Sequence, residues 1–184
     1  MNVFLLGYRG YGKSGGSPSE SGLLDDTKSA LDYLQNVLEI DTAKRLFVLG
    51  ASIGGAIGVN LALHCHERLA GMILENTFTS LKAMAKILAP TLAPFVWLIG
   101  DRYNSKASME TLMQKSGGKF PVCFLVSLED EMIPPEHSVA LYSLCGSDSA
   151  RLHTFPKGTH CNACLQPGYY ECISNFLFSN KAKN

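Results

Sequence analysis

The sequence predicts an α/β fold in which helices cover both faces of a mostly parallel sheet. Short apolar segments typical of buried strands alternate along the chain with longer segments whose apolar residues recur at helical spacing. The length of 184 residues suits one domain, and the 46% hydrophobic and 17% charged residues are typical of a globular protein. We therefore expect residues 1–184 to form a single domain.

The expected elements follow from these apolar patterns. Five short apolar segments predict strands at Asn2–Leu6, Arg45–Leu49, Gly71–Leu74, Val122–Val126 and Arg151–Phe155. Four helices are expected, at Leu23–Leu38, Ala56–His64, Pro135–Cys145 and Tyr169–Phe178. The first has apolar residues at helical spacing, the second has small residues that allow close packing on a sheet, and the third begins with prolines.

Residues 79–115 lack strand alternation and are rich in Leu, Ala, Met and Pro, so we expect a helical, lid-like segment lying over the site. Its most apolar part, Ile87–Ile99, is interrupted by Pro90 and Pro94. This part is shorter than the ~20 residues that a membrane-spanning helix needs. It either covers an apolar pocket or forms part of a helical core, and the pattern does not decide between the two.

A G-x-S-x-G motif lies between the second predicted strand and the helix that follows it. Its residues are Gly50-Ala51-Ser52-Ile53-Gly54. A serine in such a tight strand-to-helix turn exposes its hydroxyl, and the backbone N–H of the next residue faces the developing oxyanion. A serine hydroxyl is a weak nucleophile alone and needs a base with a carboxylate to orient it. The motif therefore predicts Ser52 as a nucleophile and Ile53 as half of an oxyanion hole.

An acid and a histidine follow two later strands in the order that this chemistry requires. Asp130 lies in a run of three acids, and spacing alone leaves Glu129 and Glu131 open as the orienting carboxylate. Among five histidines, His160 is the one expected on a loop that follows a strand, so we expect it to be the base. Ser52, Asp130 and His160 would all lie beyond the carboxyl ends of strands, where parallel sheets bind their ligands.

A competing motif near the start of the chain indicates a different function. Residues 7–14, Gly-Tyr-Arg-Gly-Tyr-Gly-Lys-Ser, match the phosphate-binding loop of NTPases. In such loops the Lys and Ser open a helix whose amides help to hold the phosphates. Here Gly-Gly-Ser-Pro follows at residues 15–18, which disfavours a first helical turn, and the next strand ends at Gly50 without an acid for magnesium. We therefore favour a turn-rich loop.

Charge and cysteine content argue against several other classes of function. Lys and Arg together number 16, as do Asp and Glu, and no basic stripe is present, so we expect no nucleic-acid partner. The six cysteines are unevenly spaced and no signal peptide is recognised, which indicates mostly free thiols in a reducing compartment. The segment His160-Cys161-x-x-Cys164 offers too few ligands for zinc, so we expect no metal and no cofactor.

Beyond the G-x-S-x-G motif, four further segments carry a family resemblance: Arg9–Gly15, Glu75–Phe78, Ile133–Pro135 and Phe155–His160. With them the chain resembles the alpha/beta-hydrolase superfamily and, within it, the Bem-type serine hydrolases related to alpha/beta-hydrolase domain-containing protein 13. The resemblance runs from about Val3 to Phe178. It implies the alpha/beta-hydrolase fold, with Ser52 as nucleophile, Asp130 as acid and His160 as base.

The resemblance also implies that this chain lacks the first strands of that fold. Relatives place an H-G-G or H-G-N segment after their third strand, and that segment supplies the second oxyanion N–H. In the family sheet the third strand lies between the strands that correspond to Asn2–Leu6 and Arg45–Leu49. Here these two must pair directly or leave unpaired edges. We therefore expect a partial domain, as in an N-terminally shortened form of a longer protein.

Together these observations predict a serine hydrolase that cleaves an ester or thioester through an acyl-enzyme. Its expected substrate is a small molecule with an acyl or lipid-like group. The alternative is a non-catalytic form that keeps the fold and acts as a binding or regulatory protein. We expect the chain as given to be soluble, intracellular and without a membrane span, whereas the resemblance implies relatives that are single-pass membrane proteins.

Overall fold

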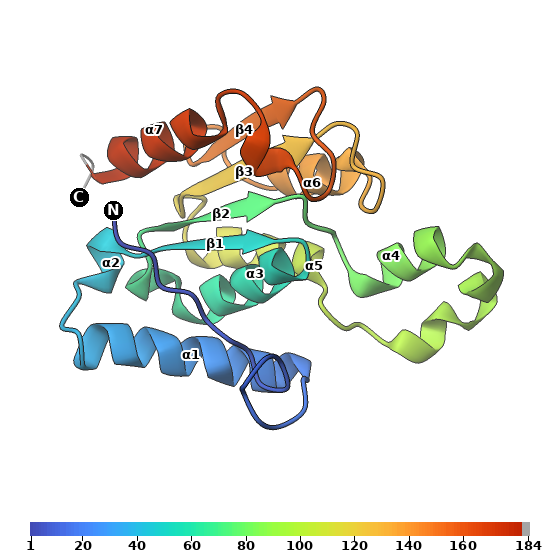
Figure 1. The fold of residues 1–184 in the computed structure, drawn as a ribbon, viewed down its shortest axis with the longest axis horizontal. Coiled ribbons are helices and arrows are strands. Elements are labelled where there is room, and N and C mark those ends of the chain that lie inside the picture. Colours follow the sequence, from blue (N-terminus) through green and yellow to red (C-terminus); the bar gives the residue numbers. More distant parts are fainter. Residues whose placement is uncertain (182–184) are drawn as a thin grey trace.

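The computed structural model describes residues 1–181, without the side chains of residues 92, 93, 96, 99 and 181. Within these residues four strands form one parallel sheet in the order β1-β2-β3-β4 (Figure 1). The strands are β1 (Phe47–Ala51), β2 (Gly71–Glu75), β3 (Val122–Ser127) and β4 (Ala150–Phe155). All four were predicted, and their ends differ from the predicted ends by up to two residues.

The predicted strand Asn2–Leu6 is wrong. Residues 1–8 contain no regular secondary structure, and Val3 and Leu5 are 71% and 88% exposed. Figure 1 shows this segment passing the start of β1 and descending toward helix α1, where Phe4 lies near Tyr33, instead of running beside β1. A run of apolar residues becomes a strand only where a neighbouring strand satisfies its backbone N–H and C=O groups. Within the described residues β1 pairs with β2 alone and is therefore an edge of the sheet.

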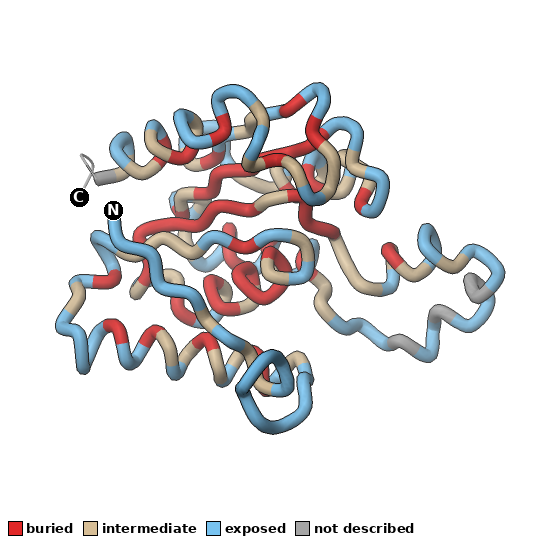
Figure 2. The backbone as a smooth tube through the Cα atoms, in the orientation of Figure 1, coloured by how far each residue is buried: buried red, intermediate tan, exposed pale blue. Residues whose placement is uncertain are grey.

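Helices cover both faces of the sheet, as predicted. The helical elements are α1 (Glu20–Asn36), α2 (Thr42–Arg45), α3 (Ile53–Cys65), η1 (His66–Arg68), α4 (Leu81–Leu88), η2 (Pro90–Ile99), α5 (Ser105–Lys115), α6 (Pro135–Tyr142), η3 (Ala163–Leu165) and α7 (Tyr169–Lys181). Alternate strand residues point to opposite faces. Met72 and Leu74 of β2 accordingly pack with α1, α3, α5 and α6, whereas Ile73 packs with α7. Figure 2 shows that the buried residues gather along the central strands and on the helix faces that meet them.

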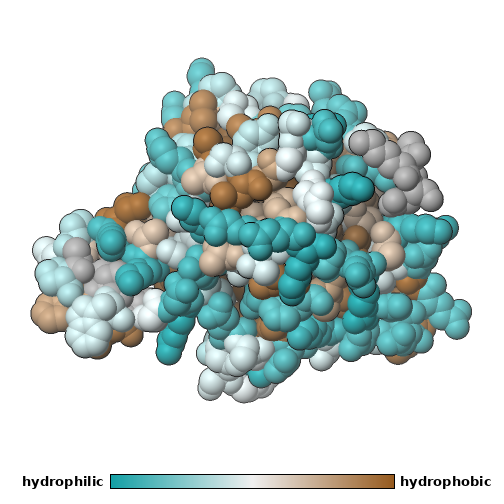
Figure 3. All heavy atoms as spheres, turned by 180° about the vertical axis from the view of Figure 1, so that it is seen from behind, coloured by the Kyte–Doolittle hydropathy of each residue, from teal (hydrophilic) through white to brown (hydrophobic). Residues whose placement is uncertain are grey.

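The predicted lid-like segment divides into two parts with different surroundings. Helix α5 belongs to the core, because Met109 and Leu112 are fully buried there. Elements α4 and η2 form an arm that projects from the carboxyl end of the sheet (Figure 1). Met84 anchors the start of this arm against Ala56 and Ile133. Beyond that anchor large apolar side chains are exposed at Ile87, Leu88, Phe95, Trp97 and Leu98, and Figure 3 shows apolar atoms on the surface of this arm.

The loop that resembles a phosphate-binding motif is a series of turns. No helix begins at Lys13 or Ser14. Helix α1 begins at Glu20, after a cap in which Ser19 Oγ accepts the N–H of Gly22. Arg9 instead fastens the loop to α1 through a salt bridge with Asp26, and its hydrogen bonds lower the pKa of that carboxyl group. The loop therefore lacks the helix N-terminus on which phosphate binding depends.

Candidate active site

Ser52 lies in a tight turn between the end of β1 and the start of α3. Its φ of 53° and ψ of −123° are unfavourable for a residue with a Cβ atom. The turn is held by the Ser52 N–H, which donates to the carbonyl of Glu75 at 2.9 Å. A Cβ atom on Gly50 would lie 2.3 Å from the carbonyl oxygen of Gly54, so the turn tolerates only glycine at that position. The G-x-S-x-G pattern thus reflects how closely strand and helix approach here.

Asp130 and His160 lie in hydrogen-bond contact beyond the carboxyl ends of β3 and β4. His160 Nδ1 is 2.8 Å from Asp130 Oδ2, and the two side chains are 10% and 1% exposed. The other carboxylate oxygen of Asp130 accepts the backbone N–H groups of Met132 and Ile133 at 2.9 and 2.8 Å. Both oxygens are therefore occupied, which fixes the orientation of the carboxylate. With a proton on Nδ1, the imidazole keeps Nε2 as an acceptor.

The neighbouring acids take other positions. Glu131 Oε2 accepts the backbone N–H of His160 at 3.1 Å. A hydrogen bond from its own backbone N–H, and then the bond from His160, lower the pKa of Glu131. Glu129 contributes its backbone N–H to the carbonyl of Gly158 at 2.9 Å. Of the three acids that the spacing left open, Asp130 is the one whose carboxylate contacts the His160 ring.

The other histidines are engaged elsewhere. His137 lies at the start of α6, where its ring contacts Thr79 Oγ1 at 2.8 Å and burial lowers its pKa. His64 bonds the carbonyl of Asn60 within α3, and His66 packs edge-on against Phe120. Burial likewise lowers the pKa of His153 in β4.

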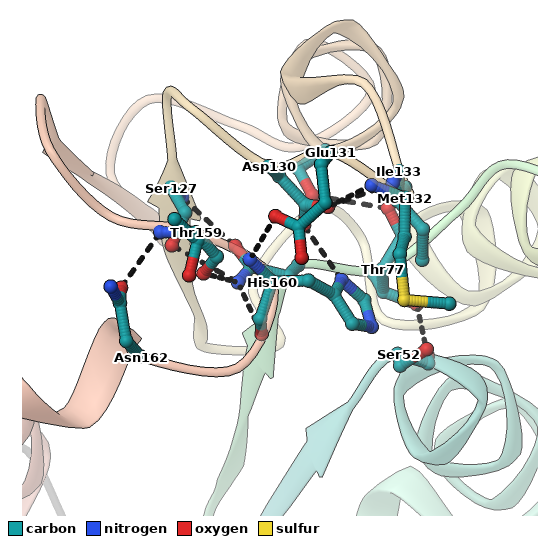
Figure 4. A network of polar contacts seen from close by, with 12 residues as sticks. Ser52, Thr77, Ser127, Asp130, Glu131, Met132, Ile133, Thr159, His160 and Asn162 are labelled. Carbon is teal, nitrogen blue, oxygen red and sulfur yellow. Dashed lines mark hydrogen bonds and ion pairs between the residues drawn. The ribbon is translucent and has the colours of Figure 1, made fainter.

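Figure 4 shows the His160 imidazole between the Asp130 carboxylate and the turn that carries Ser52. Ser52 Oγ makes no hydrogen bond to the ring within the described residues. In ligand-free enzymes such catalytic hydrogen bonds are often long and tighten when substrate binds. Ile53 supplies the first helical N–H of α3, and an N–H at that position has no acceptor within the helix.

Three polar residues without a predicted role join these parts together. Thr77 Oγ1 donates to the Ser52 carbonyl at 2.8 Å, and the side chain of Asn76 contacts both Ser127 and the loop that carries His160. Two features of the sequence point to them. Asn76 and Thr77 directly follow one buried strand, and Ser127 ends another at the same edge of the sheet.

Comparison with known proteins identifies the family. The profile of the family described as serine aminopeptidase, S33, matches residues 1–105. The chain is 43% identical over 180 residues to protein bem46 of Schizosaccharomyces pombe, covering 98% of this chain and 58% of bem46. The chain belongs to the serine aminopeptidase S33 family of alpha/beta hydrolases.

Two further similarities agree with this assignment. The chain is 37% identical over 177 residues to the uncharacterized membrane protein YNL320W of Saccharomyces cerevisiae, covering 96% of this chain and 61% of that protein. The crystal structure of an alpha-beta hydrolase from Vibrio vulnificus superposes with a TM-score of 0.74 at 21% identity, covering 92% of this chain and 61% of that chain. This alpha/beta-hydrolase chain thus spans about three fifths of the length of these curated relatives, and its fold is shorter than the full fold.

The part of the chain that the structure describes shows neither a membrane-spanning helix nor a metal-binding cluster. Within residues 1–181 of this alpha/beta hydrolase, no helix has the length and apolar character needed to cross a membrane, although one relative is named a membrane protein. The same residues contain no group of three His, Cys, Asp or Glu side chains arranged to hold a metal ion. The six cysteines are free; Cys161 is exposed and Cys164 packs partly buried beside α7.

Proposed function

We propose that this chain is a serine hydrolase that cleaves an ester or thioester through an acyl-enzyme, with Ser52, His160 and Asp130 as its catalytic triad. The observation that carries the proposal is the hydrogen bond between His160 Nδ1 and Asp130 Oδ2, formed beside a strained turn that holds Ser52. A buried carboxylate on one nitrogen of an imidazole leaves the other nitrogen as the base, which is the arrangement that activates a serine hydroxyl.

The reaction would proceed in two steps at this site. Ser52 Oγ attacks the carbonyl carbon as His160 Nε2 takes the hydroxyl proton, and the resulting imidazolium is stabilised by Asp130. The Ile53 N–H donates to the developing oxyanion. His160 then gives its proton to the leaving alcohol or thiol, which leaves the acyl group on Ser52. Water, deprotonated by His160, attacks this ester and releases the acid.

The surroundings of the triad favour a substrate with an apolar acyl group. Ile53, Leu128 and Met132 lie within two positions of Ser52 or Asp130 in the chain and are 43%, 46% and 45% exposed. The projecting arm adds exposed apolar side chains at the same end of the sheet. Burial of apolar substrate carbons against such side chains contributes roughly 25 cal/mol per Å² of area removed from water. We therefore propose an acyl or lipid-like small molecule as the substrate.

Fluorophosphonate labelling tests the proposal. A fluorophosphonate forms a covalent bond with an activated serine Oγ and loses fluoride, so intact mass reports one adduct for each active site. We expect one adduct on the chain, located at Ser52 by peptide mapping, and none on Ser52→Ala. Ser80→Ala serves as the matched control, because Ser80 Oγ caps α4 by accepting the N–H of Ala83 and forms no hydrogen bond with Ser52, Asp130 or His160 within the described residues. Circular dichroism of all three proteins establishes that they are folded.

A non-catalytic binding form is the second candidate. It is favoured by the lack of a hydrogen bond between Ser52 Oγ and His160 within the described residues. A folded chain that takes up no fluorophosphonate at Ser52 would support this candidate and overturn the hydrolase.

A further inference from the structure

Asn76 occupies a backbone conformation that few residues adopt. It directly follows β2, its φ is 43°, and it is 3% exposed. The left-handed region costs energy for residues with a Cβ atom, and Asn and Asp tolerate it better than most because their short side chains bond locally. The main chain is therefore turned sharply at the point where it leaves the sheet beside Ser52.

The side-chain amide of Asn76 connects the loops that follow β3 and β4. Its Oδ1 accepts the N–H of Ser127 at 2.8 Å, and its Nδ2 donates to Ser127 Oγ at 3.0 Å. The same Nδ2 reaches the carbonyl oxygens of Thr159 and His160 at 3.4 and 3.3 Å. One buried side chain thus holds the main chain of the proposed base against the end of the strand that leads to Asp130.

The residues on either side of Asn76 hold the turn of the proposed nucleophile. The Glu75 carbonyl accepts the Ser52 N–H at 2.9 Å, and Thr77 Oγ1 donates to the Ser52 carbonyl at 2.8 Å. The three consecutive residues 75–77 therefore contact the loops of both Ser52 and His160, which are separated by more than one hundred positions in the sequence.

We propose that Asn76 is a positioning residue, whose Nδ2 donor group sets the place of the His160 main chain and thereby the hydrogen bond of the His160 ring to Asp130. This inference rests on the proposed function. The inference goes beyond that function by assigning the alignment of the proposed triad to a residue that contacts no reacting atom.

The donor group can be removed with little change in size. Asn76→Asp keeps the shape of the side chain and its tolerance of positive φ. It places a carboxylate oxygen where Nδ2 stood, facing the carbonyl oxygens of Thr159 and His160, so attraction becomes repulsion. The loop that carries His160 is then expected to move away from β3.

Asn162→Asp is the matched control. Asn162 lies on the same loop, and its Oδ1 accepts the N–H of Thr159 at 2.7 Å and that of the Gln166 amide at 3.2 Å. No donor bond from Asn162 Nδ2 is formed within the described residues, so an aspartate there keeps both accepted bonds. Both variants add one negative charge to the same region. Only Asn76→Asp removes an amide group that donates hydrogen bonds.

The experiment uses proton NMR of the full chain, with the downfield Nδ1–H signal of the His160–Asp130 bond assigned by its loss in His160→Ala. We expect Asn76→Asp to lose or shift this signal, and to react with a fluorophosphonate roughly 10- to 100-fold more slowly, the scale on which small misplacements reduce rates. Asn162→Asp is expected to keep both the signal and a labelling rate close to that of the wild type.

Three outcomes would overturn the inference. The first is an unchanged Nδ1–H signal in Asn76→Asp, and the second is that Asn162→Asp loses the signal to the same extent as Asn76→Asp. The third is that Asn76→Asp has a lower thermal stability with no change in the signal. If Asn76→Asp does not fold, Asn76→Gly replaces it, because glycine keeps the positive φ without the amide. Failure of both variants to fold would make Asn76 a general folding residue and reject the positioning role. A wild type that shows the signal but does not label would reject the proposed function alone.

Discussion

The Thr77 hydroxyl donates a hydrogen bond of 2.8 Å to the carbonyl oxygen of Ser52 and thereby connects the segment after β2 to the turn after β1. Thr77 is fully buried, and a Cβ atom on Gly55 would lie 2.4 Å from its Oγ1. The glycine and the threonine therefore fit together, and the first turn of α3 can approach β2 closely enough for Ser52 to lie at the carboxyl end of the sheet.

Thr77→Val tests the role of this hydrogen bond. Valine keeps the shape of threonine and removes the hydroxyl, so we expect a loss of about 1 kcal/mol in the free energy of unfolding and slower fluorophosphonate labelling of Ser52. Thr27→Val is the control, because Thr27 Oγ1 donates to the Leu24 carbonyl within α1 and not to the turn that carries Ser52. Chemical denaturation and labelling rates check both variants. Equal labelling rates in the two variants would argue against a role for Thr77 at Ser52.

Asp130→Asn tests the orientation of the proposed base. The amide oxygen can still accept the N–H groups of Met132 and Ile133, but Nδ2 would donate to His160 Nδ1 and force the proton onto Nε2. In the serine proteases the corresponding change lowers kcat by about 10⁴-fold through the wrong tautomer. We expect a loss of similar order in the rate of ester hydrolysis.

Glu131→Gln provides the comparison for that variant. A glutamine oxygen can accept the His160 backbone N–H as the glutamate does, so its activity should stay near that of the wild type. A larger loss of the ester-hydrolysis rate in Glu131→Gln than in Asp130→Asn would indicate that Glu131, not Asp130, is the acid.

Gly158→Ala tests the packing of the loop that carries His160. A Cβ atom there would lie 2.6 Å from Ser127 Oγ and 2.9 Å from Ser127 Cβ, both buried at the end of β3. We expect a destabilisation of roughly 1 to 3 kcal/mol, typical of overpacking, together with loss of labelling at Ser52. Gly15→Ala is the control, because a Cβ atom at that position meets no atom within 4 Å. Similar midpoint temperatures of thermal unfolding in Gly158→Ala and Gly15→Ala would refute the predicted clash.

Leu49→Lys tests the free edge of the sheet. Leu49 is 52% exposed on β1, which pairs with β2 alone within the described residues. Unpaired edges promote association between chains, and lysine on an edge strand opposes it. We expect the wild type to associate with rising concentration in sedimentation experiments, and Leu49→Lys to associate less. Leu165→Lys, at a 79% exposed position outside the sheet, should leave the association unchanged.

Much of the α/β architecture was predictable because it depends on local patterns. The apolar segments that became β2 and β3 are buried on both faces, and such strands show as continuous apolar runs. The G-x-S-x-G turn was equally predictable, because Gly50 and the positive φ at Ser52 are local requirements of a strand that passes directly into a helix. By contrast, Asn2–Leu6 has the same apolar character and forms no strand, because strand formation also depends on a neighbour.

The proposed triad shows the same division. Ser52 and His160 could be proposed from their places after predicted strands, but the spacing of three consecutive acids could not choose among them. The structure brings the carboxylate of Asp130 to His160 and turns Glu131 toward the backbone, a difference of one position along a loop. The position of Asn76 after a buried strand places it at the carboxyl edge of the sheet, but its hydrogen-bond partners could not be predicted from the sequence, since they lie 51 and 84 positions away. Hydrogen bonds between distant loops depend on three-dimensional distances, and these exist only after the strands have been aligned side by side.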